Sequence, residues 1–141
     1  MYITPEVIEG WIDLSCNTKD KVEPSAIELF KDLKEKGKDI VVLTNFFEKT
    51  QVTRLENSGL LPYITQVYSG EEYVKPSVQS YINAAGNFEM DKCIMIGDNY
   101  ENDYLAPREW GMYSVLYDSE DLRPKKYNDV VKSLRKLKGR Y

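Results

Sequence analysis

Apolar runs rich in β-branched residues alternate with segments of helical periodicity along most of this sequence. The run IVVLTN (residues 40–45) is apolar up to Thr44, and CIMIG (residues 93–97) has the same character. Strands that are buried on both faces have this composition, because helices cover both sides of a parallel sheet. The alternation therefore predicts an α/β fold, in which a parallel sheet carries helices on both faces.

The same pattern continues to the end of the chain, so its 141 residues are expected to form a single domain, residues 1–141. Gly37 and Gly59 follow two of the helical stretches and are typical of helix C-termini. The expected strands are residues 40–45, 64–70, 93–97 and 112–117. The expected helices are residues 24–36, 48–58 and 76–85, a short piece at 102–111, and residues 126–137.

Histidine is absent from the sequence, which removes several kinds of catalytic site at once. Ser-His-Asp and Cys-His catalysis, HExxH zinc sites and imidazole proton shuttles are all excluded. Chemistry must depend on carboxylates, lysines, hydroxyls or a metal that is bound through oxygen. The two cysteines, Cys16 and Cys93, are expected to be reduced, and no apolar run is long enough to span a membrane. We therefore expect a cytoplasmic protein with no membrane partner.

The C-terminal stretch is basic, although the chain as a whole is acidic. Residues 123–141 contain eight Lys or Arg against one acid, Asp129, whereas the net charge of the chain is −4. Four apolar residues recur there at helical spacing: Val130, Val131, Leu134 and Leu137. The pattern predicts a basic amphipathic C-terminal helix that packs its apolar face on the sheet. On this interpretation the basic charge faces an acidic body, and no nucleic-acid partner is expected.

Polar residues stand at the ends of two of the expected strands. Thr44 and Asn45 end the first strand, and Asp98 follows the apolar run that closes with Gly97. In open parallel sheets, ligands bind in the crevice outside the carboxyl ends of the strands. We therefore expect these side chains to border a binding crevice.

Together with two further residues, these strand ends form an ordered set of three motifs. The motifs are Leu43-Thr44-Asn45, the pair Lys75-Pro76, and Gly97-Asp98-Asn99 followed by Asp103. The set resembles the haloacid dehalogenase-like (HAD) superfamily of phosphohydrolases over roughly residues 24–118. In that family a Thr or Ser binds phosphate, a lysine forms the next motif, and a GD-x-x-x-x-D loop forms the last. The resemblance implies a Rossmann-like HAD core and a Mg²⁺-dependent phosphatase that acts on a small phosphorylated metabolite.

The resemblance also implies a role for each matching residue. Thr44, Asn45 and Lys75 would bind the phosphate or orient the substrate, and Asp98 would be a Mg²⁺ ligand. Lys75, Asp98 and Asp103 would form the catalytic set, with Asp103 either supporting the metal site or pairing with Lys75. These roles make physical sense, because phosphoryl transfer needs positioning and charge neutralisation and Mg²⁺ prefers oxygen ligands.

The first motif of the family, an apolar strand ending in D-x-D-x-T, has no clear counterpart here. One interpretation takes residues 1–20 as a degenerate first strand, with Asp13 as the nucleophile and Ser15 in place of the second aspartate. The other takes them as the remnant of a helical cap, since Thr4-Pro5-Glu6 is a good helix start.

In the family this first strand is central, between the strands that carry Thr44 and Asp98. Its absence would leave an unpaired edge on both neighbours. The alternative to a phosphatase is therefore a non-catalytic HAD-like binding or complementing module. Such a module would form a homo-oligomer or bind a second chain that completes the sheet.

Overall fold

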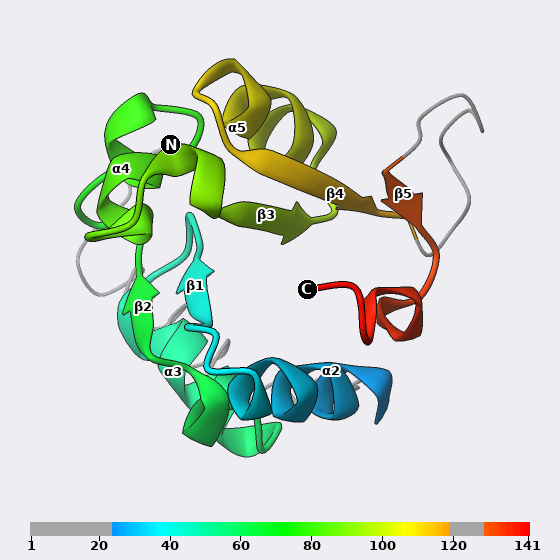
Figure 1. Cartoon of the computed structure of the whole chain (residues 1–141). Coiled ribbons are helices and arrows are strands. Elements are labelled where there is room, and N and C mark those ends of the chain that lie inside the picture. Colours follow the sequence, from blue (N-terminus) through cyan, green and yellow to red (C-terminus); the bar gives the residue numbers. More distant parts are fainter. Residues whose placement is uncertain (1–23, 119–128) are drawn as a thin grey trace.

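The structure, a computed structural model, describes residues 24–118 and 129–141. Residues 1–20, for which the sequence left two interpretations open, lie outside this range. Strands and helices alternate along the chain (Figure 1). The strands are β1 (Val41–Leu43), β2 (Gln66–Tyr68), β3 (Ile94–Gly97), β4 (Tyr113–Tyr117) and β5 (Val130–Val131). The α-helices are α2 (Pro24–Glu35), α3 (Glu48–Asn57), α4 (Val78–Ala85) and α5 (Ala106–Glu109). Shorter helical turns are η1 (Leu61–Tyr63), η2 (Met90–Lys92), η3 (Tyr100–Leu105) and η4 (Leu134–Leu137), of which η3 is π-helical and the others are 3₁₀.

Every strand pair in the described residues is parallel, which confirms the predicted α/β class. β1 pairs with β2, and Val42 lies opposite Val67. β3, β4 and β5 form a second sheet, in which Ile96 lies opposite Val115. Parallel neighbours need a crossover connection. Helix α3 and turn η1 lie in the connection between β1 and β2, and η3 and α5 lie in the connection between β3 and β4.

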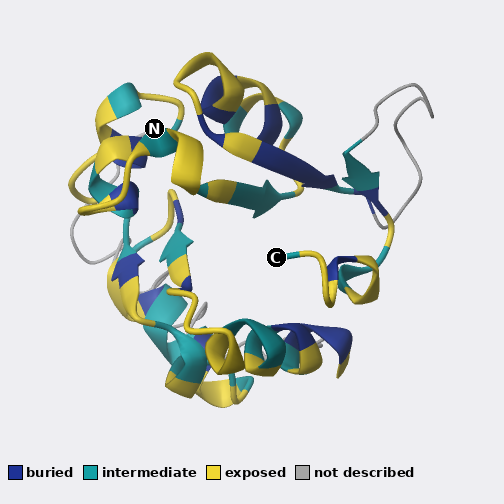
Figure 2. Ribbon diagram, in the orientation of Figure 1, coloured by how far each residue is buried: buried dark blue, intermediate teal, exposed yellow. Residues whose placement is uncertain are grey.

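Within residues 24–118 and 129–141, β1 pairs only with β2 and β3 pairs only with β4. Each of these two strands therefore has one edge without a partner strand in these ranges. Figure 1 shows β1–β2 and β3–β5 as separate sheets. None of the residues of β1 or β3 is buried, although both strands are apolar, whereas β4 buries its three central residues (Figure 2). Edges of this kind expose backbone N–H and C=O groups that can pair with a further strand. Within the described residues, the two strands that carry Thr44 and Asp98 at their ends therefore each leave one edge unpaired.

Helices cover both faces of the β3–β4–β5 sheet. On one face Val115 belongs to a buried apolar cluster with Leu29 of α2 and Leu137 of η4. Successive side chains of a strand point to opposite faces, and the next residue back, Ser114, donates a hydrogen bond to the carbonyl of Tyr104 in η3 on the other face (2.8 Å). The predicted cover of helices on both faces is thus confirmed for this sheet. No helix of the described part of the chain combines the length and the apolar composition needed to cross a bilayer.

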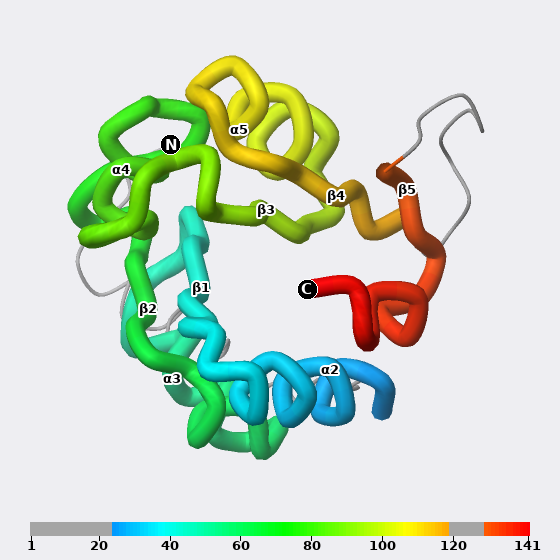
Figure 3. The backbone as a smooth tube through the Cα atoms, in the orientation of Figure 1, coloured from blue at the N-terminus to red at the C-terminus, as the bar shows by residue number. Residues whose placement is uncertain are grey.

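The C-terminal stretch differs from the amphipathic helix predicted for it. Residues 123–128 lie outside the described range, Val130–Val131 is a strand parallel to β4, and Leu134–Leu137 is a single 3₁₀ turn. The predicted helix is wrong because two adjacent β-branched valines complete the edge of β4, and that pairing outweighs the weak helical preference of valine. Val131 and Leu137 are still buried, and Val130 and Leu134 are partly buried. The segment then runs back past α2 (Figure 3), where Gly139 N–H donates to Asp32.

Candidate active site

A buried ion pair joins two of the residues singled out in the sequence. The Lys75 ammonium donates to Asp103 Oδ1 at 2.5 Å, and only 10% of the lysine side chain and 6% of the aspartate side chain are exposed. Lys75 lies just before α4, and Asp103 lies in η3, which directly follows the end of β3. Removing one partner of such a buried pair leaves an uncompensated charge, which is strongly destabilising. Of the two roles that the sequence left open for Asp103, the structure shows the pairing with Lys75.

The main chain at the end of β3 is built around the Asp103 carboxylate. Its second oxygen, Oδ2, accepts a hydrogen bond from the Asn99 N–H at 3.1 Å. Gly97 makes this approach possible, because a Cβ at residue 97 would lie 2.2 Å from Asp103 Oδ2. The Asn99 side chain accepts from Asn102 N–H at 2.9 Å and closes the start of η3. The GD-x-x-x-x-D spacing therefore lets the second aspartate fold back over the end of its own strand.

At the end of β1, Asn45 connects the strand to Lys75. The Asn45 side chain accepts a hydrogen bond from Lys75 N–H (2.8 Å) and donates one to the Lys75 carbonyl (3.2 Å). Thr44 is buried, and its hydroxyl oxygen accepts from Phe46 N–H at 3.1 Å. Since a hydroxyl has one proton and two lone pairs, this contact leaves the Thr44 proton free to be donated to a ligand.

Asp98 is exposed at the carboxyl end of β3, and no hydrogen bond or ion pair joins its carboxylate to another described residue. In the described ranges no group of three His, Cys, Asp or Glu side chains gathers closely enough to hold a metal ion. Protein-bound Mg²⁺ nevertheless needs only one or two carboxylates, because water and substrate phosphate complete its six ligands. Asp98 therefore fits Mg²⁺ as a single oxygen ligand.

Tyr81 supports the segment that follows β3 and belongs to none of the three sequence motifs. Its side chain is fully buried in α4, and its hydroxyl donates to the carbonyl of Asn102 at 2.6 Å. Burial raises the pKa of Tyr81 to about 12, and the nearby negative charge of Asp103 adds to the shift. Helical spacing alone could identify Tyr81 as an inward-facing residue, but its long-range polar contact has no local sequence signal.

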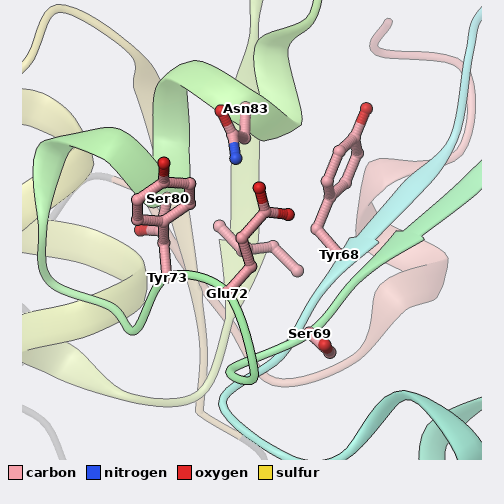
Figure 4. A pocket seen from close by; sticks show the side chains of 7 residues that line it. Tyr68, Ser69, Glu72, Tyr73, Ser80 and Asn83 are labelled. Atoms are coloured by element: carbon pink, nitrogen blue, oxygen red, sulfur yellow. The ribbon is translucent and has the colours of Figure 1, made fainter.

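A small pocket opens beside the end of β2 (Figure 4). Its empty volume is about 190 Å³, which includes space open to solvent. The lining is Leu43, Tyr68, Ser69, Glu72, Tyr73, Ser80 and Asn83, and the Glu72 carboxylate points between Tyr68 and Asn83. Pockets that enclose small ligands usually measure roughly 300–1,000 Å³. This pocket is too small and open to hold a whole metabolite.

The structure brings the predicted residues to one end of the two sheets. Hydrogen bonds run from Asn45 to Lys75, from Lys75 to Asp103 and from Asp103 to the Asn99 main chain. Thr44 precedes Asn45, and Asp98 precedes Asn99, so both lie directly beside this chain of contacts. The site thus combines a hydroxyl, an ammonium group and a free carboxylate, which is a chemistry suited to a phosphate ester and a hard cation.

Comparison with protein families agrees with this geometry. A family model described as haloacid dehalogenase-like hydrolase matches residues 11–111, which is more than half of the chain. The chain therefore belongs to the haloacid dehalogenase-like hydrolase family, and its parallel sheets and helices are those of a Rossmann-like HAD core.

Two characterised relatives and one solved structure illustrate the likeness. The chain is 29% identical over 102 residues to ribulose-1,5-bisphosphate 5-phosphatase of Halopiger xanaduensis, a match that covers 70% of this chain and 43% of that protein. It is 30% identical over 102 residues to pyrimidine 5'-nucleotidase PynA of Streptococcus pneumoniae, covering 69% and 43%. A HAD phosphatase structure from Thermococcus onnurineus superposes with a TM-score of 0.77 at 21% identity, over 94% of this chain and 61% of the other. The chain thus spans less than half the length of these two relatives.

Proposed function

We propose that this chain carries the phosphate-binding and metal-binding part of a Mg²⁺-dependent phosphatase that acts on a small phosphorylated metabolite. The observation that carries the proposal is the buried ion pair of Lys75 and Asp103 between the carboxyl ends of β1 and β3. The names of the matched relatives, a sugar-bisphosphate phosphatase and a pyrimidine nucleotidase, support a small phosphate ester as the substrate class. We place this activity in the cytoplasm, as expected from the sequence.

In this proposal each residue acts on the phosphoryl group through charge or hydrogen bonding. The Thr44 hydroxyl donates its free proton to a phosphoryl oxygen, with Asn45 beside it, and the Lys75 ammonium neutralises negative charge on the ester. Asp103 keeps that ammonium in place. Asp98 would hold Mg²⁺, which supplies further charge neutralisation when bound. Phosphoryl transfer depends mainly on such positioning and charge stabilisation.

Attack on phosphorus needs a further carboxylate, because Asp103 is engaged by Lys75 and Asp98 is assigned to the metal. The candidate from the sequence is Asp13, which lies outside the described residues. A covalent aspartyl intermediate would require that residue or its equivalent on another chain.

The test is hydrolysis of p-nitrophenyl phosphate with and without Mg²⁺. We expect slow hydrolysis that EDTA abolishes, and loss of it in Asp98→Ala and Lys75→Met. Asp91→Ala is the matched control, because Asp91 is an exposed carboxylate of η2, before the start of β3 and not at its carboxyl end. Equal activity of the Asp98 and Asp91 variants would refute the assignment of Asp98.

The edges of β1 and β3 that are unpaired among residues 24–118 and 129–141 favour a second candidate, a module without catalysis of its own that is completed by another strand. This candidate predicts that the chain self-associates or binds a second chain, and that beryllium fluoride forms no covalent-like adduct with it. Sedimentation at increasing concentration, with and without beryllium fluoride and Mg²⁺, separates the two. A monomer that forms the adduct supports the phosphatase, and an assembly without adduct formation supports the module.

A further inference from the structure

The Asn45 carboxamide holds the main chain of Lys75 at two points. Its Oδ1 accepts the Lys75 N–H at 2.8 Å, and its Nδ2 donates to the Lys75 carbonyl at 3.2 Å. The two residues are 30 positions apart, so the contact is not imposed by local chain geometry. A carboxamide that pairs with both groups of one residue resembles the pairing between neighbouring strands, and it fixes the orientation of that residue as well as its distance.

The main chain of Asn45 is itself fixed, which makes its side chain a rigid anchor. Gly70 packs directly against it, because a Cβ at residue 70 would lie 2.4 Å from the Asn45 carbonyl oxygen. Gly70 N–H also donates to the Phe46 carbonyl at 3.1 Å, and Thr44 N–H donates to the Tyr68 carbonyl at 3.0 Å. The anchor therefore extends from the end of the β1–β2 sheet.

Lys75 needs such an anchor, because the segment before it is exposed. Four consecutive exposed residues, Glu71 to Val74, lead to Lys75, and Pro76 has no N–H with which to bind a neighbour. Beyond this point the Lys75 side chain reaches across to Asp103 at the end of β3. The contacts from Asn45 to Lys75 to Asp103 consequently link two sheets that share no strand pairing in the described part of the chain.

We propose that Asn45 is a positioning residue, whose carboxamide sets the main chain of Lys75 so that its ammonium lies against Asp103. This assigns to Asn45 a role through Lys75 in place of a direct contact with substrate. The inference rests on the proposed function only in its consequence for phosphate binding, and the hydrogen bonds stand independently of it.

The test measures how fast an amine-reactive acylating reagent labels Lys75 in the full chain, with each lysine followed by mass spectrometry. In Asn45→Ala we expect Lys75 to be labelled about tenfold faster than in the parent, the factor that corresponds to losing one or two neutral hydrogen bonds. Asn45→Asp keeps the acceptor for Lys75 N–H and should give a smaller increase. Asn87→Ala, at an exposed asparagine between α4 and η2, is the matched control and should change nothing.

Exposed Lys36 and Lys138 serve as internal references for the activity of the reagent, and urea denaturation followed by circular dichroism shows separately whether a variant is folded. If Asn45→Ala does not fold, the Asn45→Asp variant decides the question. An unchanged labelling rate of Lys75 in the folded variants would overturn the proposal.

Repeating the labelling with inorganic phosphate separates this inference from the proposed function. If phosphate protects Lys75 in the parent but labelling is unaffected by the Asn45 variants, the phosphate site stands and the positioning role fails. If the variants accelerate labelling but phosphate gives no protection in the parent, Asn45 positions Lys75 and the phosphate site fails.

Discussion

The close approach of Gly97 and Asp103 allows a sharp prediction for Gly97→Ala. The main chain at Gly97 is not in the left-handed region, so alanine brings no backbone strain of its own. Its Cβ, however, would lie 2.2 Å from Asp103 Oδ2 and 2.6 Å from Asp103 Cβ, and the first helical turn after β3 must move away. That movement pulls the Asp103 carboxylate from the Lys75 ammonium.

Two effects add to the predicted loss of stability. Overpacking at a crowded position costs roughly 1–3 kcal/mol. Complete loss of one partner of a buried ion pair costs roughly 3–5 kcal/mol, and a displaced pair loses only part of this. We expect Gly97→Ala to lower the free energy of unfolding by about 3 kcal/mol, and hence the melting temperature by roughly 10 °C for a domain of this size. Urea denaturation followed by circular dichroism measures the first quantity directly.

A double-mutant cycle with Asp103→Gly attributes the loss to its cause. Asp103→Gly removes all three atoms that the alanine would meet, so Gly97→Ala in that background should cost less than about 1 kcal/mol. A loss of the same size in both backgrounds would show that crowding by Asp103 is not the reason, and would refute the account of the GD-x-x-x-x-D loop given above.

Three further substitutions test other parts of the structure by chemical denaturation. Leu137→Ala should lower the free energy of unfolding by roughly 2–5 kcal/mol, because Leu137 is fully buried, whereas exposed Leu105→Ala should have a much smaller effect. Thr50→Val should stabilise by about 1 kcal/mol, since the buried Thr50 hydroxyl has no hydrogen-bond partner in the described residues; a destabilised variant would contradict this. Tyr81→Phe should lose about 1 kcal/mol at neutral pH through its bond to Asn102. Because the pKa of Tyr81 is raised from 10.0 to about 12, its contribution is present below pH 10 and is lost as the pH rises towards 12, so parent and variant should converge there.

Local sequence patterns placed most elements well, since their causes are local. The apolar strand of residues 93–97 and the helix that Gly59 follows were predicted to within one or two residues, because apolar runs and helix-stopping glycines act over short distances. The prediction for the C-terminal stretch was wrong because its structure depends on pairing with another strand. Val130 and Val131 pair with Leu116 and Tyr117 of the preceding strand, and no periodicity in the stretch itself indicates that pairing.

The candidate site shows the same division. The residue types at the strand ends could be predicted, because parallel strands present their carboxyl ends together. The contacts that hold those residues could not, since they join positions 28 and 30 residues apart through single side chains. Gly97 could be recognised as part of a motif. The reason why a glycine is needed there, the space that Asp103 occupies, is visible only in three dimensions.

The separation of the two sheets has a consequence for the stability of the site. Where neighbouring strands pair, their hydrogen bonds fix the relative position of the strand ends. β1 and β3 lack such pairing in the described residues, so the position of Lys75 relative to Asp103 depends on α4. Tyr81 and Ala85 of α4 share an apolar cluster with Leu43 of β1 and with Met112, just before β4. Helix α4 thus connects β1 with the segment that leads into β4, and it begins three residues after Lys75. Substitutions in this cluster should therefore disturb the ion pair even when they lie outside the site.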